Sequence, residues 1–224
     1  MNPGETFIHG GANVGLFTLT AAASVGPTGS VVAFEPAAET RRLLTRNIAL
    51  IGFDWVTVRP EGLDRESTHR SFVAFEGDAA GLSSFAPESA AALGTLVDIK
   101  TCTLDDALGP GVREAVSLVK LDLEGAEYAA LLGAQSLLAN GSADLLLELE
   151  PGHLERQGAT ALELVSLLRG FGFDFYRVED DGQGHIGLVR DPRPEIRGER
   201  PNILATKTAE RARRAGIPVQ GLQA

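Results

Sequence analysis

Short apolar runs alternate with stretches of helical periodicity along most of this chain. The apolar runs have the length of strands and occupy residues 6–9, 30–34, 55–58, 115–121, 144–148 and 173–176. Between these runs, leucine, isoleucine and alanine recur at helical spacing in residues 14–23, 36–51, 127–138 and 159–169. Strands that alternate with helices in this way indicate an open, mostly parallel sheet with helices on both faces.

The alternation is interrupted between residues 61 and 104. Residues 71–75 and 97–102 have the pattern of extended strands, and a stretch rich in Gly, Ala and Ser separates them. We expect a strand pair with a long mobile connection, inserted over the site. Further along, residues 186–189 and 202–205 predict the last strands, whereas residues 208–224 carry only a weak, Arg-rich helical pattern.

The predicted fold is α/β, a single doubly wound, Rossmann-like domain over residues 1–206 with a C-terminal tail at 207–224. Its sheet is expected to be seven-stranded and mostly parallel, with an antiparallel edge strand and the inserted strand pair. A chain of 224 residues is long enough for one substantial core. In such sheets, ligands bind at the carboxyl ends of the strands, where the winding direction reverses.

Charge and cysteine content narrow the classes of partner. The formal net charge is -10, and a field of that sign repels nucleic-acid phosphates and anionic lipid. We therefore expect neither nucleic acid nor membrane as a partner, while a homodimer is compatible with the sequence. The single cysteine, Cys102, forms no intrachain disulfide and is expected in the core. The first residues lack a signal sequence, so we expect a soluble cytoplasmic protein.

The first strand leads into a glycine-rich loop, His9-Gly-Gly-Ala-Asn-Val-Gly15, at the start of a helix. Backbone amides and absent side chains let a cofactor approach closely there. Glu35 lies 20 residues after Gly15, at the end of the second strand, where a carboxylate accepts hydrogen bonds from a ribose. Counted from Gly11, Asn13 replaces the second glycine of the dinucleotide pattern. The loop therefore favours an adenosine-containing cofactor without a pyrophosphate.

Four segments, in this order, resemble the motifs of FkbM-type methyltransferases. They are Phe7-Ile-His-Gly-Gly-Ala-Asn-Val-Gly15, Val32-Ala-Phe-Glu-Pro36, Thr103-Leu-Asp-Asp106 and Val119-Lys-Leu-Asp-Leu-Glu-Gly-Ala-Glu127. The resemblance covers about residues 4–178, and residues 120–127 are its most specific part. It implies the class I methyltransferase fold, S-adenosylmethionine as cofactor, and usually O-methylation of a hydroxyl on a natural product or sugar.

The resemblance also implies roles for individual residues. The loop residues His9, Gly11, Asn13 and Gly15 are expected around the methionine part of the cofactor, Glu35 at the ribose, and Glu61 or Gly62 at the adenine edge. Ser83 and Ser84 match a loop that closes near the site, and Glu124 and Glu150 are expected on the substrate side.

Two features depart from the family pattern. The family normally has Asp at the position of His9, and a cationic His9 would oppose the ammonium group of the cofactor, whereas a neutral imidazole accepts a hydrogen bond. Relatives also usually carry helices upstream of the first strand, where this chain begins almost at that strand. Either those helices are missing or the recorded start is internal.

Asp122, at the end of the fourth strand, is the best-placed catalytic candidate. Methyl transfer to oxygen needs alignment of the two reactants and a group that accepts the hydroxyl proton. Asp122 can act as that base, or it can hold a divalent cation with Glu148 or Glu150 as co-ligand. His153, in a loop after the next strand, is a second candidate base. Glu127 is expected to be structural, since acids are favourable in the first turn of a helix.

The sequence thus predicts an S-adenosylmethionine-dependent methyltransferase that acts on a small hydroxylated acceptor. One alternative is a nicotinamide-dependent oxidoreductase, which Asn13 and the lack of a Tyr-x-x-x-Lys pair disfavour. The other is a methyltransferase fold weakened into a non-catalytic binding module.

Overall fold

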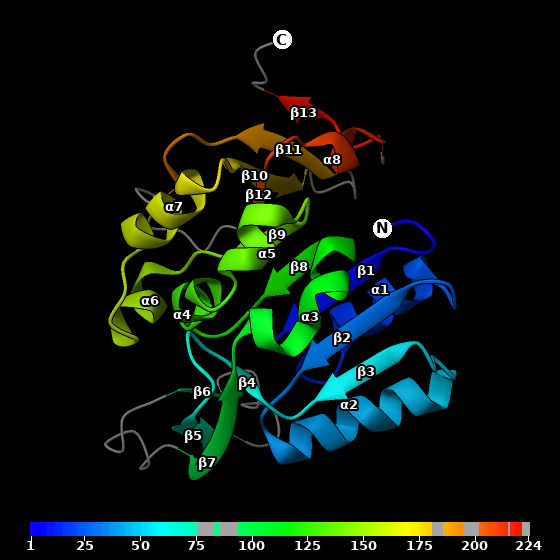
Figure 1. The fold of residues 1–224 in the computed structure, drawn as a ribbon, viewed down its shortest axis with the longest axis vertical. Coiled ribbons are helices and arrows are strands. Elements are labelled where there is room, and N and C mark those ends of the chain that lie inside the picture. Colours follow the sequence, from blue (N-terminus) through cyan, green and yellow to red (C-terminus); the bar gives the residue numbers. More distant parts are fainter. Residues whose placement is uncertain (76–82, 86–93, 181–185, 195–201, 215, 221–224) are drawn as a thin grey trace.

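The computed structural model describes residues 1–75, 83–85, 94–180, 186–194, 202–214 and 216–220. A nine-stranded mixed sheet forms its centre, in the strand order β13-β11-β10-β12-β9-β8-β1-β2-β3 (Figure 1). The strands of this sheet are β1 (Thr6–Gly10), β2 (Ser30–Phe34), β3 (Val56–Arg59), β8 (Val116–Leu121), β9 (Asp144–Glu148), β10 (Asp174–Asp180), β11 (Ile186–Arg190), β12 (Asn202–Thr206) and β13 (Val219–Gln220).

The five strands from β9 to β3 are parallel, so the carboxyl ends of β1, β2, β8 and β9 lie at one edge. This half confirms the predicted parallel sheet. The expected seven strands with one antiparallel edge strand were wrong. β12 lies inside the sheet, antiparallel to both β9 and β10, because β11 and β13 extend the sheet beyond β10. Residues 219 and 220 of the predicted tail thus pair with β11.

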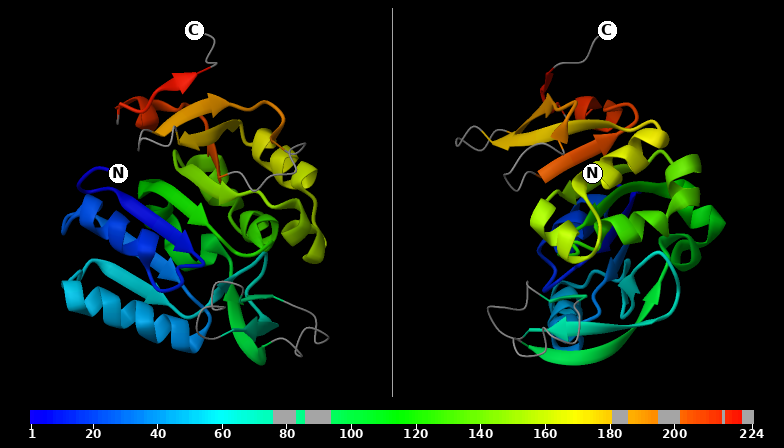
Figure 2. Two further views of the ribbon diagram at one scale, coloured as in Figure 1. Left: turned by 180° about the vertical axis from the view of Figure 1, so that it is seen from behind. Right: turned by 90° about the vertical axis from the view of Figure 1, so that its left-hand side faces the viewer.

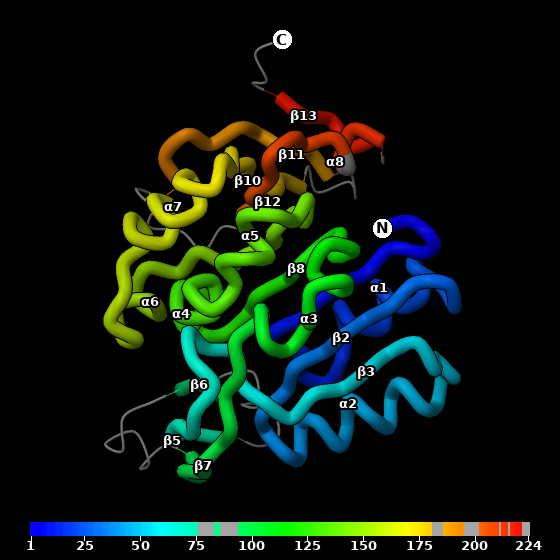
Figure 3. Tube along the Cα trace, viewed as in Figure 1, coloured from blue at the N-terminus to red at the C-terminus, as the bar shows by residue number. Residues whose placement is uncertain are grey.

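The inserted strand pair is present, but as part of a second sheet. This sheet has the order β4-β7-β5-β6, with β4 (Gly62–Leu63), β5 (His69–Ala74), β6 (Ser84–Phe85) and β7 (Thr95–Cys102). β5 and β7 form the predicted strand pair, and they run antiparallel. The tube view shows the small sheet at one end of the molecule and β10 to β13 at the other (Figure 3). Most of the connection predicted to be long and mobile lies outside the described residues.

Eight helices are described, and they cover both faces of the main sheet (Figures 1 and 2). They are α1 (Leu16–Val25), α2 (Ala38–Ile51), α3 (Leu104–Ala115), α4 (Glu127–Leu132), α5 (Gln135–Asn140), α6 (Pro151–Arg156), α7 (Ala161–Gly170) and α8 (Glu210–Arg214). In the view of Figure 1, α3, α4 and α5 lie in front of the sheet and α1 lies behind it. No helix in the described part of the chain is long and apolar enough to cross a membrane.

The predicted helix at 127–138 is two helices, because Gly133 interrupts it. A Cβ at Gly133 would lie 2.3 Å from the carbonyl oxygen of Asp64, so only glycine fits against this carbonyl at the break. The Gly133 carbonyl turns away to accept a hydrogen bond from the amide of Asp105 at 3.0 Å. Close contact with the segment after β4 thus overrides the helical spacing of the leucines.

The main core lies between the sheet and helices α3 to α7. Its members are apolar side chains with almost no exposure, among them Ile8, Leu104, Leu121, Leu131, Leu145, Val165 and Phe175. Cys102 belongs to this core, as expected, and burial raises the pKa of its thiol to about 11. Burial of these side chains is the main stabilising contribution to the fold.

Candidate functional site

The glycine-rich loop between β1 and α1 is held against the ends of the neighbouring strands. The amides of Gly11 and Ala12 both donate to the carbonyl of Phe34, at 3.1 and 3.0 Å. Gly11 has a φ of 74°, and a Cβ there would lie 1.9 Å from the carbonyl oxygen of Asp122. Only glycine allows this approach, so the loop after β1 and the end of β8 meet at Gly11.

Glu35 joins this loop to the start of α2. Its Oε2 accepts a hydrogen bond from the amide of Asn13 at 2.8 Å, and its Oε1 accepts one from the amide of Ala37 at 2.9 Å. The side chain is buried, which raises the pKa of the carboxyl above its ordinary value, and the two amide donors oppose this shift. Asn13 itself has a left-handed φ of 49°, a conformation that asparagine adopts more readily than most residues with a Cβ.

His9 lies in the interior, behind the loop. Its Nδ1 is 2.8 Å from Oγ1 of Thr18, and its ring packs edge-on against Phe17. Burial lowers the pKa of His9 to about 3, and the positive charge of Lys120 adds to the effect, so the imidazole is neutral near pH 7. Its Nε2 is buried and has no hydrogen-bond partner among the described residues. His9 therefore places no positive charge beside the loop.

Glu61 and Gly62 follow β3. Both oxygens of Glu61 accept hydrogen bonds from Arg59, each at 3.0 Å, and this contact lowers the pKa of the Glu61 carboxyl. A Cβ at Gly62 would lie 2.8 Å from Cζ of Phe85. The glycine thus lets the ring of Phe85 reach the end of β3.

Asp122 follows β8 and pairs with a buried lysine. Nζ of Lys120 donates to Oδ2 of Asp122 at 2.7 Å, and the same ammonium lies 4.5 Å from the ring centroid of Phe17. The Lys120 side chain is 4% exposed, whereas that of Asp122 is 36% exposed. The buried ammonium therefore fixes one oxygen of a carboxylate that remains accessible.

Glu124 and His153 form a second pair beside Asp122. Oε2 of Glu124 lies 2.9 Å from Nδ1 of His153, and both side chains are mostly buried. Glu124 has a φ of 53°, which is strained for a residue with a Cβ. A Cβ at Gly125 would lie 2.1 Å from the carbonyl oxygen of His153. The turn after β8 is thus packed tightly on α6.

His153 lies in helix α6, and the predicted loop was wrong at this point. Glu150 is the N-cap of this helix, with Oε1 accepting from the amide of Gly152 at 3.3 Å, and Pro151 occupies the first turn. A proline at that position needs no amide partner, and this sequence signal identifies the start of the helix. The contact gives the carboxylate of Glu150 a structural role at the helix start.

A cavity of about 310 Å³ lies at the carboxyl edge of the sheet. It brings together nine of the residues considered above as binding or catalytic, namely Gly11, Asn13, Glu35, Glu61, Gly62, Ser83, Asp122, Glu124 and Glu148. The predicted residues His9, Gly15, Ser84, Glu150 and His153 are not among its lining residues. Their predicted roles in binding or catalysis therefore rest on the sequence and stay predictions.

The sequence prediction missed the apolar part of the lining. These residues are Phe34, Leu63, Phe72, Phe85 and Leu123, together with Pro36. Phe72 belongs to an alternating strand pattern that could have shown it as inward-facing, but nothing in the pattern indicated Phe85. Among the described residues, no group of three or more His, Cys, Asp or Glu side chains could hold a metal ion.

Comparisons with known proteins identify the family and the fold of this chain. A family model described as the methyltransferase FkbM domain matches residues 9–175. AMB antimetabolite synthetase AmbE from Pseudomonas aeruginosa is 30% identical in an alignment of 210 residues that covers 77% of this chain and 10% of AmbE. This chain thus spans about a tenth of the length of that curated relative.

Two solved structures share the fold. Methyltransferase FkbM from Methylobacillus flagellatus KT has a TM-score of 0.58 at 15% identity, over 92% of this chain and 44% of that chain. A candidate rRNA methylase from Clostridium thermocellum has a TM-score of 0.50 at 13% identity, over 92% of this chain and 86% of that chain. At such identities, the likeness concerns the fold alone.

Proposed function

This chain belongs to the FkbM methyltransferase family, and on that premise we propose that it binds S-adenosylmethionine and methylates a hydroxyl group of a small acceptor. The site is the cavity at the carboxyl ends of β1, β2, β3, β8 and β9. The observation that carries the proposal is the buried carboxylate of Glu35 in the wall of this cavity, bonded to the amides of Asn13 and Ala37.

The residues present fit the adenosine part of the cofactor. A carboxylate has about four acceptor positions, and the two amides use two of them, so Glu35 can also accept from both hydroxyls of a ribose. Because the two amides fix the carboxylate in place, it needs little reordering when the ligand binds. Glu61 and Gly62 line the cavity on the β3 side and are proposed at the adenine edge.

The acceptor is proposed to bind near Asp122. Bound S-adenosylmethionine supplies a methyl group attached to a positively charged sulfur. Lys120 holds one oxygen of Asp122 in place, so the other oxygen can accept the proton of an incoming hydroxyl. Glu124, backed by His153, lines the same part of the cavity and is proposed to orient the acceptor.

The class of acceptor is proposed from the family and its relative. AmbE is named as an antimetabolite synthetase, and this supports a small natural product as acceptor. A saccharide stays within the proposal, since hydroxyl groups are what the carboxylates of this cavity can bind.

Calorimetric titration with S-adenosylhomocysteine, and separately with a nicotinamide dinucleotide, tests the proposed cofactor. The wild-type chain should bind the first and not the second. Glu35→Ala should weaken this binding by about 1 to 3 kcal/mol, because the ribose hydroxyls lose the carboxylate that accepts their hydrogen bonds. Glu39→Ala is the matched control, because Glu39 is an exposed glutamate on α2 whose side chain pairs with Arg42 at the surface.

Three outcomes would contradict this assignment. Binding of the dinucleotide alone would favour the oxidoreductase, and binding of neither would favour a non-catalytic module. An unchanged affinity in Glu35→Ala would remove the ribose role.

In the same titrations, Asp122→Asn should bind like wild type, while methyl transfer to any acceptor that wild type uses should fall about 100-fold.

A further inference from the structure

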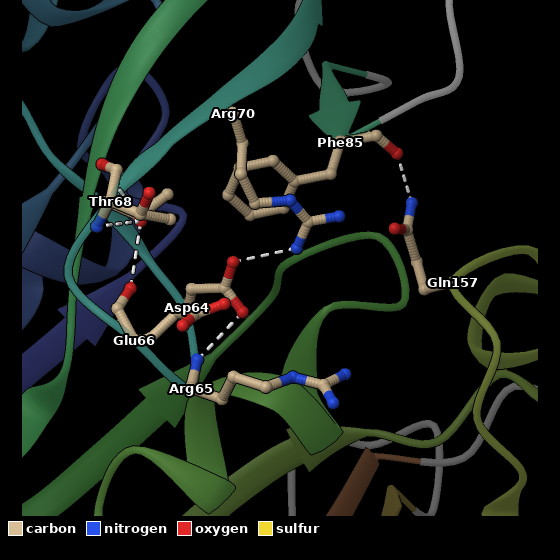
Figure 4. Close-up of polar contacts among 8 residues, drawn as sticks. Asp64, Arg65, Glu66, Thr68, Arg70, Phe85 and Gln157 are labelled. Atoms are coloured by element: carbon tan, nitrogen blue, oxygen red, sulfur yellow. Dashed lines mark hydrogen bonds and ion pairs between the residues drawn. The ribbon is translucent and has the colours of Figure 1, made fainter.

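Phe85 is held from several sides at the cavity. The guanidinium of Arg70, on β5, lies over the Phe85 ring at 4.4 Å from its centroid, and Phe72 meets the ring edge-on at 5.8 Å between centroids. The side-chain amide of Gln157, just after α6, donates to the Phe85 carbonyl from the opposite side (Figure 4). Within the described residues, β6 comprises Ser84 and Phe85, and these side-chain contacts add to its ladder bonds with β5.

Arg70 is itself fixed by a buried carboxylate. Its Nη1 donates to Oδ2 of Asp64 at 2.8 Å, and the Asp64 side chain is 3% exposed. Oδ1 of Asp64 accepts from the amide of Arg65 at 2.7 Å, and the Asp64 amide donates to the carbonyl of Cys102 at 3.0 Å. Figure 4 shows the guanidinium between the Phe85 ring and Asp64. A rigid anchor thus sets the position of the ring.

Phe85 connects the two ends of the cavity. Its ring meets Gly62, at the end proposed for the adenine, where a Cβ would lie 2.8 Å from Cζ. Its backbone is bound to Gln157, whose Cγ lies 3.1 Å from the position of a Cβ on Gly125, next to Glu124. Phe85 thus lines the cavity between its β3 side, which the ring contacts, and its β8 side, to which Gln157 ties the Phe85 backbone.

We propose that Arg70 is a positioning residue that holds Phe85 across the cavity and thereby slows the release of bound cofactor. The stacked guanidinium, pinned by Asp64, restricts the ring to the closed position. Without it, the short strand β6 would leave this position more often, and a ligand beneath would escape faster. That the ligand is S-adenosylmethionine or its product rests on the proposed function. The contacts among Arg70, Phe85 and Asp64, which we call the clasp, do not depend on it.

The release rate of S-adenosylhomocysteine, measured by stopped-flow displacement, tests the role of Arg70. Arg70→Met removes the charge but keeps the length of the side chain, and release should become about tenfold faster with a smaller change in association. Arg70→Lys keeps a cation and should restore most of the slow release. His69→Ala is the matched control, since His69 lies on the same strand and pairs with Asp98 at 2.8 Å, away from Phe85.

Arg70→Met leaves the Asp64 charge buried, and this alone can destabilise the fold. The double variant Asp64→Asn, Arg70→Met removes that charge and should still release the ligand quickly. Phe85→Ala should speed release as much as Arg70→Met, and the two changes together should not add, because both open the same clasp. The proposal would be overturned if Arg70→Met or the double variant released the ligand at the wild-type rate. It would also be overturned if His69→Ala accelerated release as much as Arg70→Met, or if the effects of Phe85→Ala and Arg70→Met were additive.

Hydrogen exchange without ligand separates the two proposals. If wild type does not bind S-adenosylhomocysteine, the proposed cofactor fails, and the clasp is then read from the amides of β5 and β6. Val73 pairs with Ser84, and the amide of Phe75 donates to Oγ of Ser83, so the exchange of these two β6-facing amides should be about tenfold faster in Arg70→Met and unchanged in His69→Ala. Equal exchange in Arg70→Met and wild type would overturn the clasp itself.

Discussion

Three carboxylates gather in the turn between β8 and α4, and their side chains are buried to different extents. Asp122 is paired with Lys120 and accessible, while Glu127 is buried with its Oε1 accepting from the amide of Leu123 at 2.7 Å. Burial raises the pKa of Glu127 to about 7, and the charges of Asp122 and Glu124 add to the shift. Glu127 is thus a structural group that supports the turn, in agreement with its expected role.

Glu127→Gln should change how stability depends on pH. The pKa of Glu127 is about 7 in the folded chain against 4.5 for the free group, so its contribution is fully present below pH 4.5 and is lost as pH rises through 7. At pH 8, wild type should therefore be less stable relative to Glu127→Gln than at pH 4.5, by as much as about 3 kcal/mol. Urea denaturation of both proteins at the two pH values measures this. A constant difference would contradict the buried, proton-binding Glu127.

At single residues, spacing in the sequence predicted position but not contacts. Glu35 was placed from its distance to Gly15, and it lies in the cavity wall. That Asn13 and Ala37 bind its oxygens could not be predicted, because these hydrogen bonds depend on the backbone angles of two separate loops. His9 was expected to face the cofactor, but its side chain lies beside Thr18, on the other side of the loop.

At the scale of elements, the sequence did not predict helices α3 and α6, because α3 contains a break and α6 is short. α3 begins at the N-cap Thr103, whose Oγ1 accepts from the amide of Asp106, but Gly109 and Pro110 interrupt its pattern with a kink. α6 is six residues long, too short to show a period. Long elements with regular spacing, such as α2 and α7, were predicted near their observed bounds.

Gly11→Ala should separate the loop after β1 from the end of β8. A Cβ would lie 1.9 Å from the carbonyl of Asp122, so the backbone must move, at a cost of about 3 kcal/mol or more. Gly52→Ala is the control, since Gly52 has a similar φ of 82° with no atom within 4 Å of its Cβ position, and it should lose about 1 to 2 kcal/mol. Chemical denaturation compares the two. Equal losses would mean that the close approach at Gly11 is not required.

At the scale of the whole molecule, the cavity is assembled from segments that only the fold brings together. Phe34 and Glu35 come from β2 and its end, Phe85 from the small sheet, and Asp122 from the end of β8. The order of strands predicted where the sheet would bind a ligand, because parallel strands end at one edge. The apolar lining was not predictable, since the position of the small sheet depends on contacts such as those of Asp64 with Arg70 and Gly133.

A crystal structure of the chain with S-adenosylhomocysteine tests the central claim most directly. We predict that both ribose hydroxyls lie within about 3 Å of the Glu35 carboxylate, which keeps its bonds to Asn13 and Ala37. The sulfur should lie between the Gly11 loop and Asp122. A ligand bound outside this cavity, or a ribose without contact to Glu35, would contradict the proposed cofactor site.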